Sequence, residues 1–285
     1  MLPERVLVAG ATGRQGGAVA RHLMERGVEV HALTRDEYSD SARELDELGA
    51  RVVEGNLRDK ESLHDAVRTG DVDAVYGVTT PVEGPDAEIE QGTNLGEVAA
   101  EHGVEQFVFS SVWSAGEDTG IPFFESKHTI ERRLANLDLP LTIVRPVSFM
   151  QNVETMRDDI MNETLSMPLE PRVPLYMIDV NDIGAFIAEA FHDRNRYVGK
   201  TFDLAGDELT LSAMAVRLSE CIGIDVMTDH VPTEAVEERG GKAYADMFRW
   251  YNRIEAPIDV AALRTNHDVD FTLFEEYLRE HGWGE

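Results

Sequence analysis

Cysteine and long apolar runs are scarce in this chain, and each scarcity excludes a class of protein. The single cysteine, Cys221, rules out an intramolecular disulfide and cannot by itself form a thiolate metal site. No apolar run approaches the roughly eighteen residues that a membrane-spanning helix needs. The N-terminal MLPERVLVAG enters an apolar strand without the cleavage region of a signal peptide. We therefore expect a cytoplasmic protein that does not enter the membrane.

Positive charge is also scarce. The 285 residues hold 26 Lys and Arg against 54 Asp and Glu, which gives a formal net charge of −28. This charge repels nucleic acid and anionic membranes, so we expect no direct binding to either. The acids are spread along the whole chain, and lysine is rarer than arginine. This pattern is typical of a halophilic protein, because at about 1 M salt the screening length falls to roughly 3 Å and surface carboxylates stop repelling one another.

Valine-rich apolar runs alternate with helix-patterned segments over the first half of the chain. The runs occupy residues 5–10, 29–34, 50–55, 73–79, 106–111 and 141–146. The segments between them, at 14–26, 41–48, 60–68, 86–102 and 125–137, place apolar residues at helical spacing, and several end near a glycine. This alternation predicts an α/β fold with a doubly wound parallel sheet.

The rhythm breaks beyond residue 150. Three prolines at 168, 171 and 174 interrupt the chain, and strand candidates follow at 173–179 and 201–206 with helices at 181–192 and 211–222. The segment 234–285 has a largely helical pattern. We predict a nucleotide-binding domain over residues 1–150 and a smaller α/β substrate lobe over 151–285, which returns one or two strands to the sheet.

A glycine-rich motif follows the first apolar run. GATGRQGG at 10–17 places Gly10, Gly13 and Gly16 at the start of the first predicted helix. Glycines at this point allow a tight turn and let backbone N–H groups approach a pyrophosphate at the positive end of the helix. The spacing is G-x-x-G-x-x-G, and its position in the first βα unit favours a dinucleotide site over a merely structural turn.

The end of the second run bears on which dinucleotide binds. A carboxylate there would bond the ribose hydroxyls and repel a 2′-phosphate, but this chain has Thr34 and Arg35. The guanidinium fork binds phosphate at two points, so NADP(H) is favoured over NAD(H). Asp36 follows directly and weakens this preference, and a plain surface role for Arg35 is the alternative.

Five segments together carry a family resemblance. They are GATGRQGG at 10–17, the segment 88–112 that begins EIEQGTNLG, IPFFESKHTIERRL at 121–134, LTIVRPVSFMQN at 141–152 and MIDVNDIG at 177–184. The chain resembles the NmrA-like family of atypical short-chain dehydrogenases. That family includes NADP(H)-sensing regulators and quinone reductases, and it is related to the isoflavone reductases. The last hundred residues match less distinctly.

The resemblance implies a set of cofactor contacts. A first group would wrap the pyrophosphate and meet the 2′-phosphate: Gly10, Ala11, Thr12, Gly13, Arg14, Gln15, Gly16 and Arg35. A second group would flank adenine and the nicotinamide ribose: Asn56, Leu57, Thr79, Thr80, Pro81 and Lys127. A third group would close over the nicotinamide end: Val147, Ser148, Phe149 and Met150.

The catalytic tyrosine of the wider superfamily is missing. It stands four residues before the lysine, where this chain has Phe123 before Lys127, and the histidine often found there in the family is missing too. Lys127 could stabilise or protonate an oxyanion, as in the isoflavone reductases. Ser110 or Ser111, at the end of the fifth run, stands where superfamily members place a polar partner for the substrate; a serine bonded to backbone is the alternative.

These residues favour NADPH-dependent reduction of a quinone or enone, whose reduced oxygen is stabilised by delocalisation. The second hypothesis is a non-catalytic NADP(H) redox sensor that acts through a protein partner, and an epimerase or dehydratase ranks third. Metal catalysis has no support, because the nine histidines show no ligand spacing. No G-x-S-x-G elbow for acyl transfer occurs. The sequence leaves a homodimer, a regulatory partner and the identity of the small-molecule substrate open.

Overall fold

The chain forms two compact units, and each unit is built from two separate segments of the sequence. A computed structural model describes residues 2–254 and 257–284. The first unit comprises Met1–Arg145 and Ile183–Asp203, and the second comprises Pro146–Asp182 and Leu204–Glu285. This division differs from the predicted ranges 1–150 and 151–285, because residues 183–203 leave the C-terminal half and pack with the first unit.

The first unit is built on a seven-stranded sheet in the order β10-β6-β5-β4-β1-β2-β3. Its strands are β1 (Arg5–Ala9), β2 (Glu29–Thr34), β3 (Arg51–Glu54), β4 (Ala74–Val78), β5 (Gln106–Ser110), β6 (Leu141–Pro146) and β10 (Thr201–Leu204). The pairs between neighbouring strands from β3 to β6 are all parallel. The predicted doubly wound parallel sheet is confirmed, as are all six strands predicted before residue 150.

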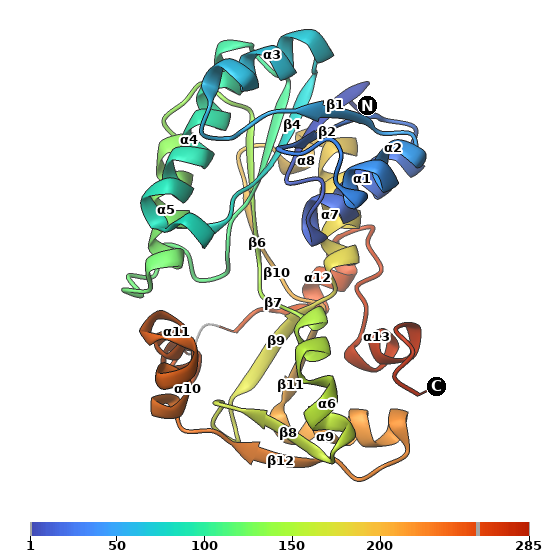
Figure 1. Cartoon of the computed structure of the whole chain (residues 1–285), viewed down its shortest axis with the longest axis vertical. Helices are drawn as coiled ribbons and strands as arrows, with labels where there is room; N and C mark the ends of the chain where they lie inside the picture. The colour runs from blue at the N-terminus through green and yellow to red at the C-terminus, as the bar shows by residue number, and fades with distance from the viewer. Residues whose placement is uncertain (1, 255–256, 285) are drawn as a thin grey trace. The chain divides into compact units, whose positions relative to one another are not determined.

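Helices cover both faces of this sheet (Figure 1). One face carries α3 (Lys60–Gly70), α4 (Pro85–Glu101) and α5 (Pro122–Leu134), and the other carries α1 (Arg14–Glu25), α2 (Asp40–Glu47) and α7 (Val180–His192), with the short α8 (Arg194–Tyr197) after it. Leu95, Ile130 and Leu134 of α4 and α5 form one buried cluster with Phe107 and Phe109 of β5. The sheet is therefore buried on both sides, which explains its valine-rich strands.

The parallel strands end at a common edge of the sheet. Since β1 lies between β4 and β2 in the strand order, the loops after β4 and β2 flank the turn that follows β1. A three-residue helix, η1 (Pro81–Glu83), lies in the loop between β4 and α4. In open α/β sheets ligands bind outside the carboxyl ends of the strands, so a ligand site is expected at this edge.

The second unit has its own small sheets and core. Strands β7 (Ser148–Phe149), β9 (Pro174–Ile178) and β11 (Asp207–Thr210) form one sheet, and β8 (Thr164–Met167) pairs with β12 (Met227–His230). Its helices are η2 (Met150–Met156), α6 (Arg157–Met161), α9 (Leu211–Ile222), α10 (Thr233–Gly240), α11 (Lys242–Tyr251), α12 (Val260–Asn266) and α13 (Phe274–Glu280).

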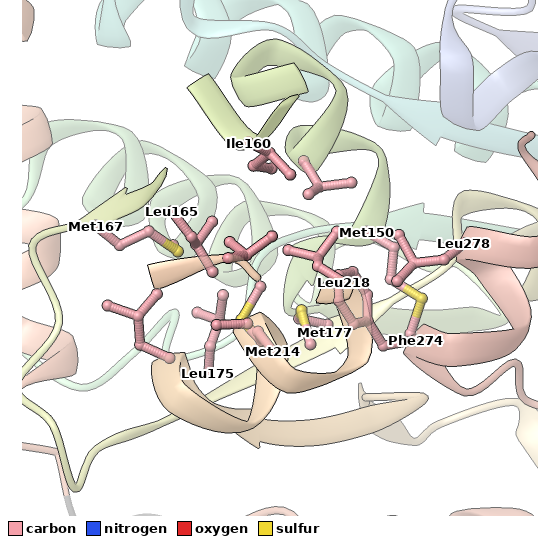
Figure 2. Close-up of a cluster of buried hydrophobic side chains, with 14 of the residues drawn as sticks. Met150, Ile160, Leu165, Met167, Leu175, Met177, Met214, Leu218, Phe274 and Leu278 are labelled. Carbon is pink, nitrogen blue, oxygen red and sulfur yellow. The ribbon is translucent and has the colours of Figure 1, made fainter. Parts of the chain in front are cut away.

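The core of the second unit is rich in methionine and leucine. Figure 2 shows Met150, Met177 and Met214 in one buried cluster with Leu218 and Phe274. The predicted helical character of 234–285 is confirmed by α10 to α13. Residues 255–256 and 285 of that segment lie outside the described residues.

Within residues 2–254 and 257–284, no helix is both long and apolar enough to cross a membrane.

Candidate functional site

The turn after β1 is closed by glycine. Gly10 has φ +68°, and a Cβ on it would lie 2.7 Å from a methyl carbon of Val78 on the neighbouring strand β4. The N–H of Gly13 donates to the carbonyl of Gly10 at 2.9 Å, so the chain reverses within four residues and enters α1. A side chain at position 10 would be strained by the backbone and blocked by β4.

The start of α1 is open and uncapped. Gly13 is the N-cap residue, and no side chain bonds the helix end. A Cβ on Gly16 would lie 2.5 Å from the carbonyl carbon of Gly10 and 2.8 Å from the nitrogen of Ala11, so α1 packs directly on the turn. The first N–H groups of a helix lack internal partners and carry partial positive charge. This arrangement fits a pyrophosphate, with Ala11, Thr12 and the backbone of Arg14 around it.

Gln15, in the first turn of α1, bonds the neighbouring strand β4. Its side chain is buried, and its Oε1 accepts a bond of 2.8 Å from the hydroxyl of Tyr76 on β4. Burial raises the pKa of Tyr76, so this hydroxyl stays a donor. The bond from Tyr76 thus occupies the carbonyl oxygen of the Gln15 side chain.

Two arginines lie at the carboxyl ends of β2 and β3. Arg35 follows β2, as predicted, with a side chain 71% exposed. Asn56 and Leu57 follow β3, where the Leu57 carbonyl accepts from Asn94 of α4 at 3.0 Å. The next residue, Arg58, donates to the carboxylate of Glu83 at 2.8 Å and was not predicted as a site residue.

Thr79 and Thr80 continue from β4, and α4 braces both. The hydroxyl of Thr79 donates to Glu88 Oε1 at 3.1 Å, and the N–H of Thr80 donates to Gln91 Oε1 at 3.2 Å. Pro81 then opens η1. The predicted ribose-binding segment is thus held by two buried side chains one helical turn apart.

The ammonium group of Lys127 is surrounded by hydrogen-bond acceptors. Its Nζ donates to Thr79 Oγ1 at 2.8 Å, to the Thr79 carbonyl at 3.2 Å and to the Ser110 carbonyl at 3.4 Å. The carboxylate of Glu88 lies 3.3 Å away and is itself fully buried. Burial lowers the pKa of Lys127, and the Glu88 carboxylate opposes that shift. Four acceptors thus surround the three N–H donors of one ammonium group.

Glu88 completes this centre from α4. Besides Lys127 and Thr79, its carboxylate accepts a hydrogen bond from the hydroxyl of Ser126. The centre therefore joins β4, β5, α4 and α5 through one buried ion pair. Sequence reasoning included Glu88 only as part of a family segment. An isolated acid in an amphipathic helix gives no sign that it faces the sheet.

Ser111, like Ser110 and Ser114 beside it, has a buried hydroxyl with no hydrogen-bond partner among the described residues. Its N–H donates to the Val144 carbonyl at 2.8 Å, which fixes the backbone beside β6. Phe123, at the position of the missing tyrosine, stacks edge-to-face on Phe124 at 5.1 Å and offers no proton.

Comparison with known proteins bears on this site. A model of the NmrA-like family matches residues 3–278, most of the chain. The chain belongs to the NmrA-like family. It is 33% identical over 221 residues to an NAD(P)H azoreductase of Xenophilus azovorans, and the match covers 74% of each chain.

Two solved structures share the fold. One is an NADPH-dependent quinone oxidoreductase of Escherichia coli in complex with NADPH, with a TM-score of 0.79, 19% identity and coverage of 97% of this chain and 99% of that one. The other is NmrA, a negative transcriptional regulator, in complex with NADP, with a TM-score of 0.81, 21% identity and coverage of 98% and 95%. The expected family is confirmed.

The remaining predicted contacts of this NmrA-like chain lie in the second unit. Val147 precedes β7, Ser148 and Phe149 form it, and Met150 starts η2 and enters the core. The structure therefore gathers the predicted residues of the first unit at one sheet edge and assigns these four to a separately folded unit.

In the part of the chain that the structure describes, no group of three or more His, Cys, Asp or Glu side chains could hold a metal ion.

Proposed function

We propose that this chain binds NADP(H) at the carboxyl edge of its first sheet and uses NADPH to reduce a quinone or conjugated enone. The observation that carries the binding is the uncapped start of α1 packed on the Gly10 turn, a packing so close that a Cβ on Gly16 would collide with the backbone of Gly10 and Ala11. Membership of the NmrA-like family and similarity to an NAD(P)H azoreductase support the reductase role.

The chain's own residues would bind and orient the cofactor. Backbone N–H groups at the start of α1 would hold the pyrophosphate, and Thr80 and Pro81 would run under the nicotinamide ribose. Bound there, the cofactor would supply the hydride.

Lys127 would act mainly as a fixed positive charge. Its contact with the Ser110 carbonyl, at 3.4 Å, is the longest of its four, so this N–H is the one most readily exchanged for a ribose hydroxyl or a developing oxyanion. The free hydroxyl of Ser111 would donate a hydrogen bond to the acceptor oxygen. Protein bonds to the ammonium thus favour electrostatic stabilisation over proton donation.

The acceptor class follows from the missing acid. Phe123 cannot protonate an alkoxide, so an ordinary ketone is a poor substrate. A quinone or enone spreads the new charge over a conjugated system, and water can then provide the proton that balances the hydride. This reasoning favours quinones and enones over simple ketones.

A second function has an observation in its favour. Phe123 offers no proton and every N–H of Lys127 already has a protein acceptor, which suits an NADP(H) sensor that binds cofactor without turnover. The similarity in fold to a negative transcriptional regulator in complex with NADP is consistent with this alternative. A sensor would pass the redox state to a protein partner.

Turnover separates the two functions. Purified protein in molar salt is mixed with NADPH and a panel of quinones and enones, and the reduced-nicotinamide absorbance is followed. We expect turnover, and we expect Ser111→Ala to lower kcat by about ten- to a hundredfold with an unchanged NADPH Kd. Tight NADPH binding without turnover across the panel would favour the sensor instead.

A further inference from the structure

One carboxylate lies between two arginine side chains at the sheet edge. Glu83 Oε2 accepts from Arg58 Nη1 at 2.8 Å, and Glu83 Oε1 lies 3.5 Å from Arg35 Nη1. Arg58 also donates through Nε to Glu90 at 2.7 Å. Two guanidinium groups from different loops thus share the Glu83 carboxylate, and one of them, Arg58, also binds Glu90.

This cluster of Arg35, Arg58 and Glu83 lies at the carboxyl edge of the sheet, where a dinucleotide would bind. Arg35 follows β2, Arg58 follows β3, and Glu83 ends η1 after β4. Because β1 lies between β4 and β2, the contact between Glu83 and Arg35 spans the carboxyl end of β1, where the glycine turn begins. In a doubly wound fold the adenosine ribose of a dinucleotide lies beside the end of the second strand. The carboxylate therefore occupies the neighbourhood of a 2′-phosphate.

The two arginines are held differently. The loop that carries Arg58 is braced, since Asn56 Oδ1 accepts the Arg58 N–H at 3.0 Å, Ser62 bonds the backbone of Asn56, and Asn94 bonds the Leu57 carbonyl. Among the described residues, the side chain of Arg35 contacts only Glu83, at 3.5 Å, and is mostly exposed. Arg58 is thus the fixed arm of the pair, and Arg35 is the arm that can adjust to a ligand.

The position of Glu83 in the chain allows its carboxylate to move away from the two arginines. Glu83 is the last residue of a three-residue helix, and the next residue, Gly84, has φ +96° with open space around it. Exposed ion pairs of this kind contribute about 1 kcal/mol or less, so a stronger anion can displace one. A phosphate monoester carries nearly two negative charges and accepts from both arginine forks.

We propose that Arg58 and Arg35 together bind the 2′-phosphate of NADP(H), and that Glu83 is an internal competitor that occupies the pair until that phosphate arrives. A cofactor without the 2′-phosphate cannot take over the contacts of Glu83, so the cluster selects NADP(H) over NAD(H). The inference rests on the proposed cofactor site and adds two residues, Arg58 and Glu83, that determine specificity.

Adenosine fragments test this without any turnover. Calorimetry measures the affinity of adenosine 2′,5′-bisphosphate and of adenosine 5′-monophosphate for the wild type, Arg58→Gln and Glu83→Gln. We expect Arg58→Gln to weaken the bisphosphate about tenfold and to leave the monophosphate unchanged. We expect Glu83→Gln to strengthen the bisphosphate about threefold relative to the monophosphate.

Glu97→Gln is the matched control. Glu97 lies on α4 and pairs with Lys60, away from the cluster, and its replacement removes one negative charge as Glu83→Gln does. We expect this variant to keep the wild-type ratio of bisphosphate affinity to monophosphate affinity. An unchanged ratio in Arg58→Gln overturns the clamp, and a weaker bisphosphate in Glu83→Gln overturns the competition.

NADPH binding separates this inference from the proposed function. Wild-type protein that binds neither NADPH nor the bisphosphate overturns both. Wild-type protein that binds both, with a ratio indifferent to positions 58 and 83, overturns only the inference.

Discussion

At the scale of single residues, the pair of Lys127 and Glu88 organises the site. Both side chains are buried and each has several hydrogen-bond partners, so neither charge is left bare. A buried ion pair adds little net stability over an apolar pair, because desolvation offsets the attraction, but removal of one partner leaves a buried charge uncompensated. The pair therefore fixes where Thr79 and Ser110 lie more than it stabilises the fold.

A double-mutant cycle tests this account of the pair. Glu88→Gln and Lys127→Met should each lower the free energy of unfolding by about 3 kcal/mol, while the double variant should lie within about 1 kcal/mol of the wild type. Urea denaturation in molar salt measures all four proteins.

Lys60→Met provides the comparison, because Lys60 forms an exposed pair with Glu97, and we expect it to change stability by less than about 1 kcal/mol. Additive losses in the double variant at positions 88 and 127 would show that the two side chains act independently.

The sequence identified residues whose role is local. Gly10 and Gly16 follow from the strand–turn–helix pattern, and Lys127 from the family position and the scarcity of lysine. Glu88, Arg58 and Glu83 could not be found in this way, because their partners come from other βα units and meet only after folding. A polar partner at Ser110 or Ser111 was predicted from position alone, and only the structure shows that neither hydroxyl is bonded to backbone among the described residues.

At the scale of elements, each βα unit brings one loop to the same edge. The strands of the first unit were predictable because burial on both faces demands continuous apolar runs. The strands β8, β11 and β12 of the second unit were not, since each has four residues and β12 is exposed throughout. Such short strands carry no distinct pattern, and their pairing depends on the tertiary structure.

The packing of α1 on the glycine turn gives an element-level prediction. A methyl group in Gly16→Ala would lie 2.8 Å from the nitrogen of Ala11, so the helix must shift away from the turn. We expect a loss of about 1–3 kcal/mol in stability and of NADPH affinity.

Gly13→Ala is the milder control, because its methyl group would lie 3.3 Å from the Gly10 carbonyl and the backbone there is extended. Thermal denaturation measures the stability of both variants, and calorimetry measures their affinity for NADPH. NADPH binding at the wild-type affinity in both variants would contradict the account.

At the scale of the whole molecule, one buried carboxylate should make stability depend on pH. Asp182 accepts two bonds from Thr272 in the second unit, at 2.7 and 2.9 Å, and burial raises its pKa to about 7. The folded state thus holds this proton more tightly than the unfolded chain, where the pKa is 3.8. The contribution of Asp182 to stability is therefore full below pH 4 and is lost as the pH rises through 7.

Asp182→Asn removes this dependence. The stability of the wild type relative to the variant should increase by about 2–3 kcal/mol between pH 8 and pH 5. Urea denaturation of both proteins across that pH range measures the difference in their free energies of unfolding. The contributions of the other titrating groups are the same in both proteins and cancel in this difference. A difference that stays constant with pH would place the proton elsewhere.

The net charge of −28 gives a second prediction for the whole chain. Surface carboxylates repel one another in dilute buffer and are screened in molar salt, so the melting temperature should rise by about 5 °C or more between the two. A halophilic origin stays a prediction until such a melt is made. No loss of stability on transfer to dilute buffer would rule it out.

The transfer of a hydride to an acceptor is the central claim, and isotope labelling tests it most directly. NADPH deuterated at the transferring position is incubated with the protein and a conjugated enone in molar salt, and the product is analysed by mass spectrometry. The account predicts one deuterium on the β-carbon of the reduced enone. Unlabelled enone recovered in full, from protein shown to bind NADPH, would contradict it and leave the sensor as the function that fits this site.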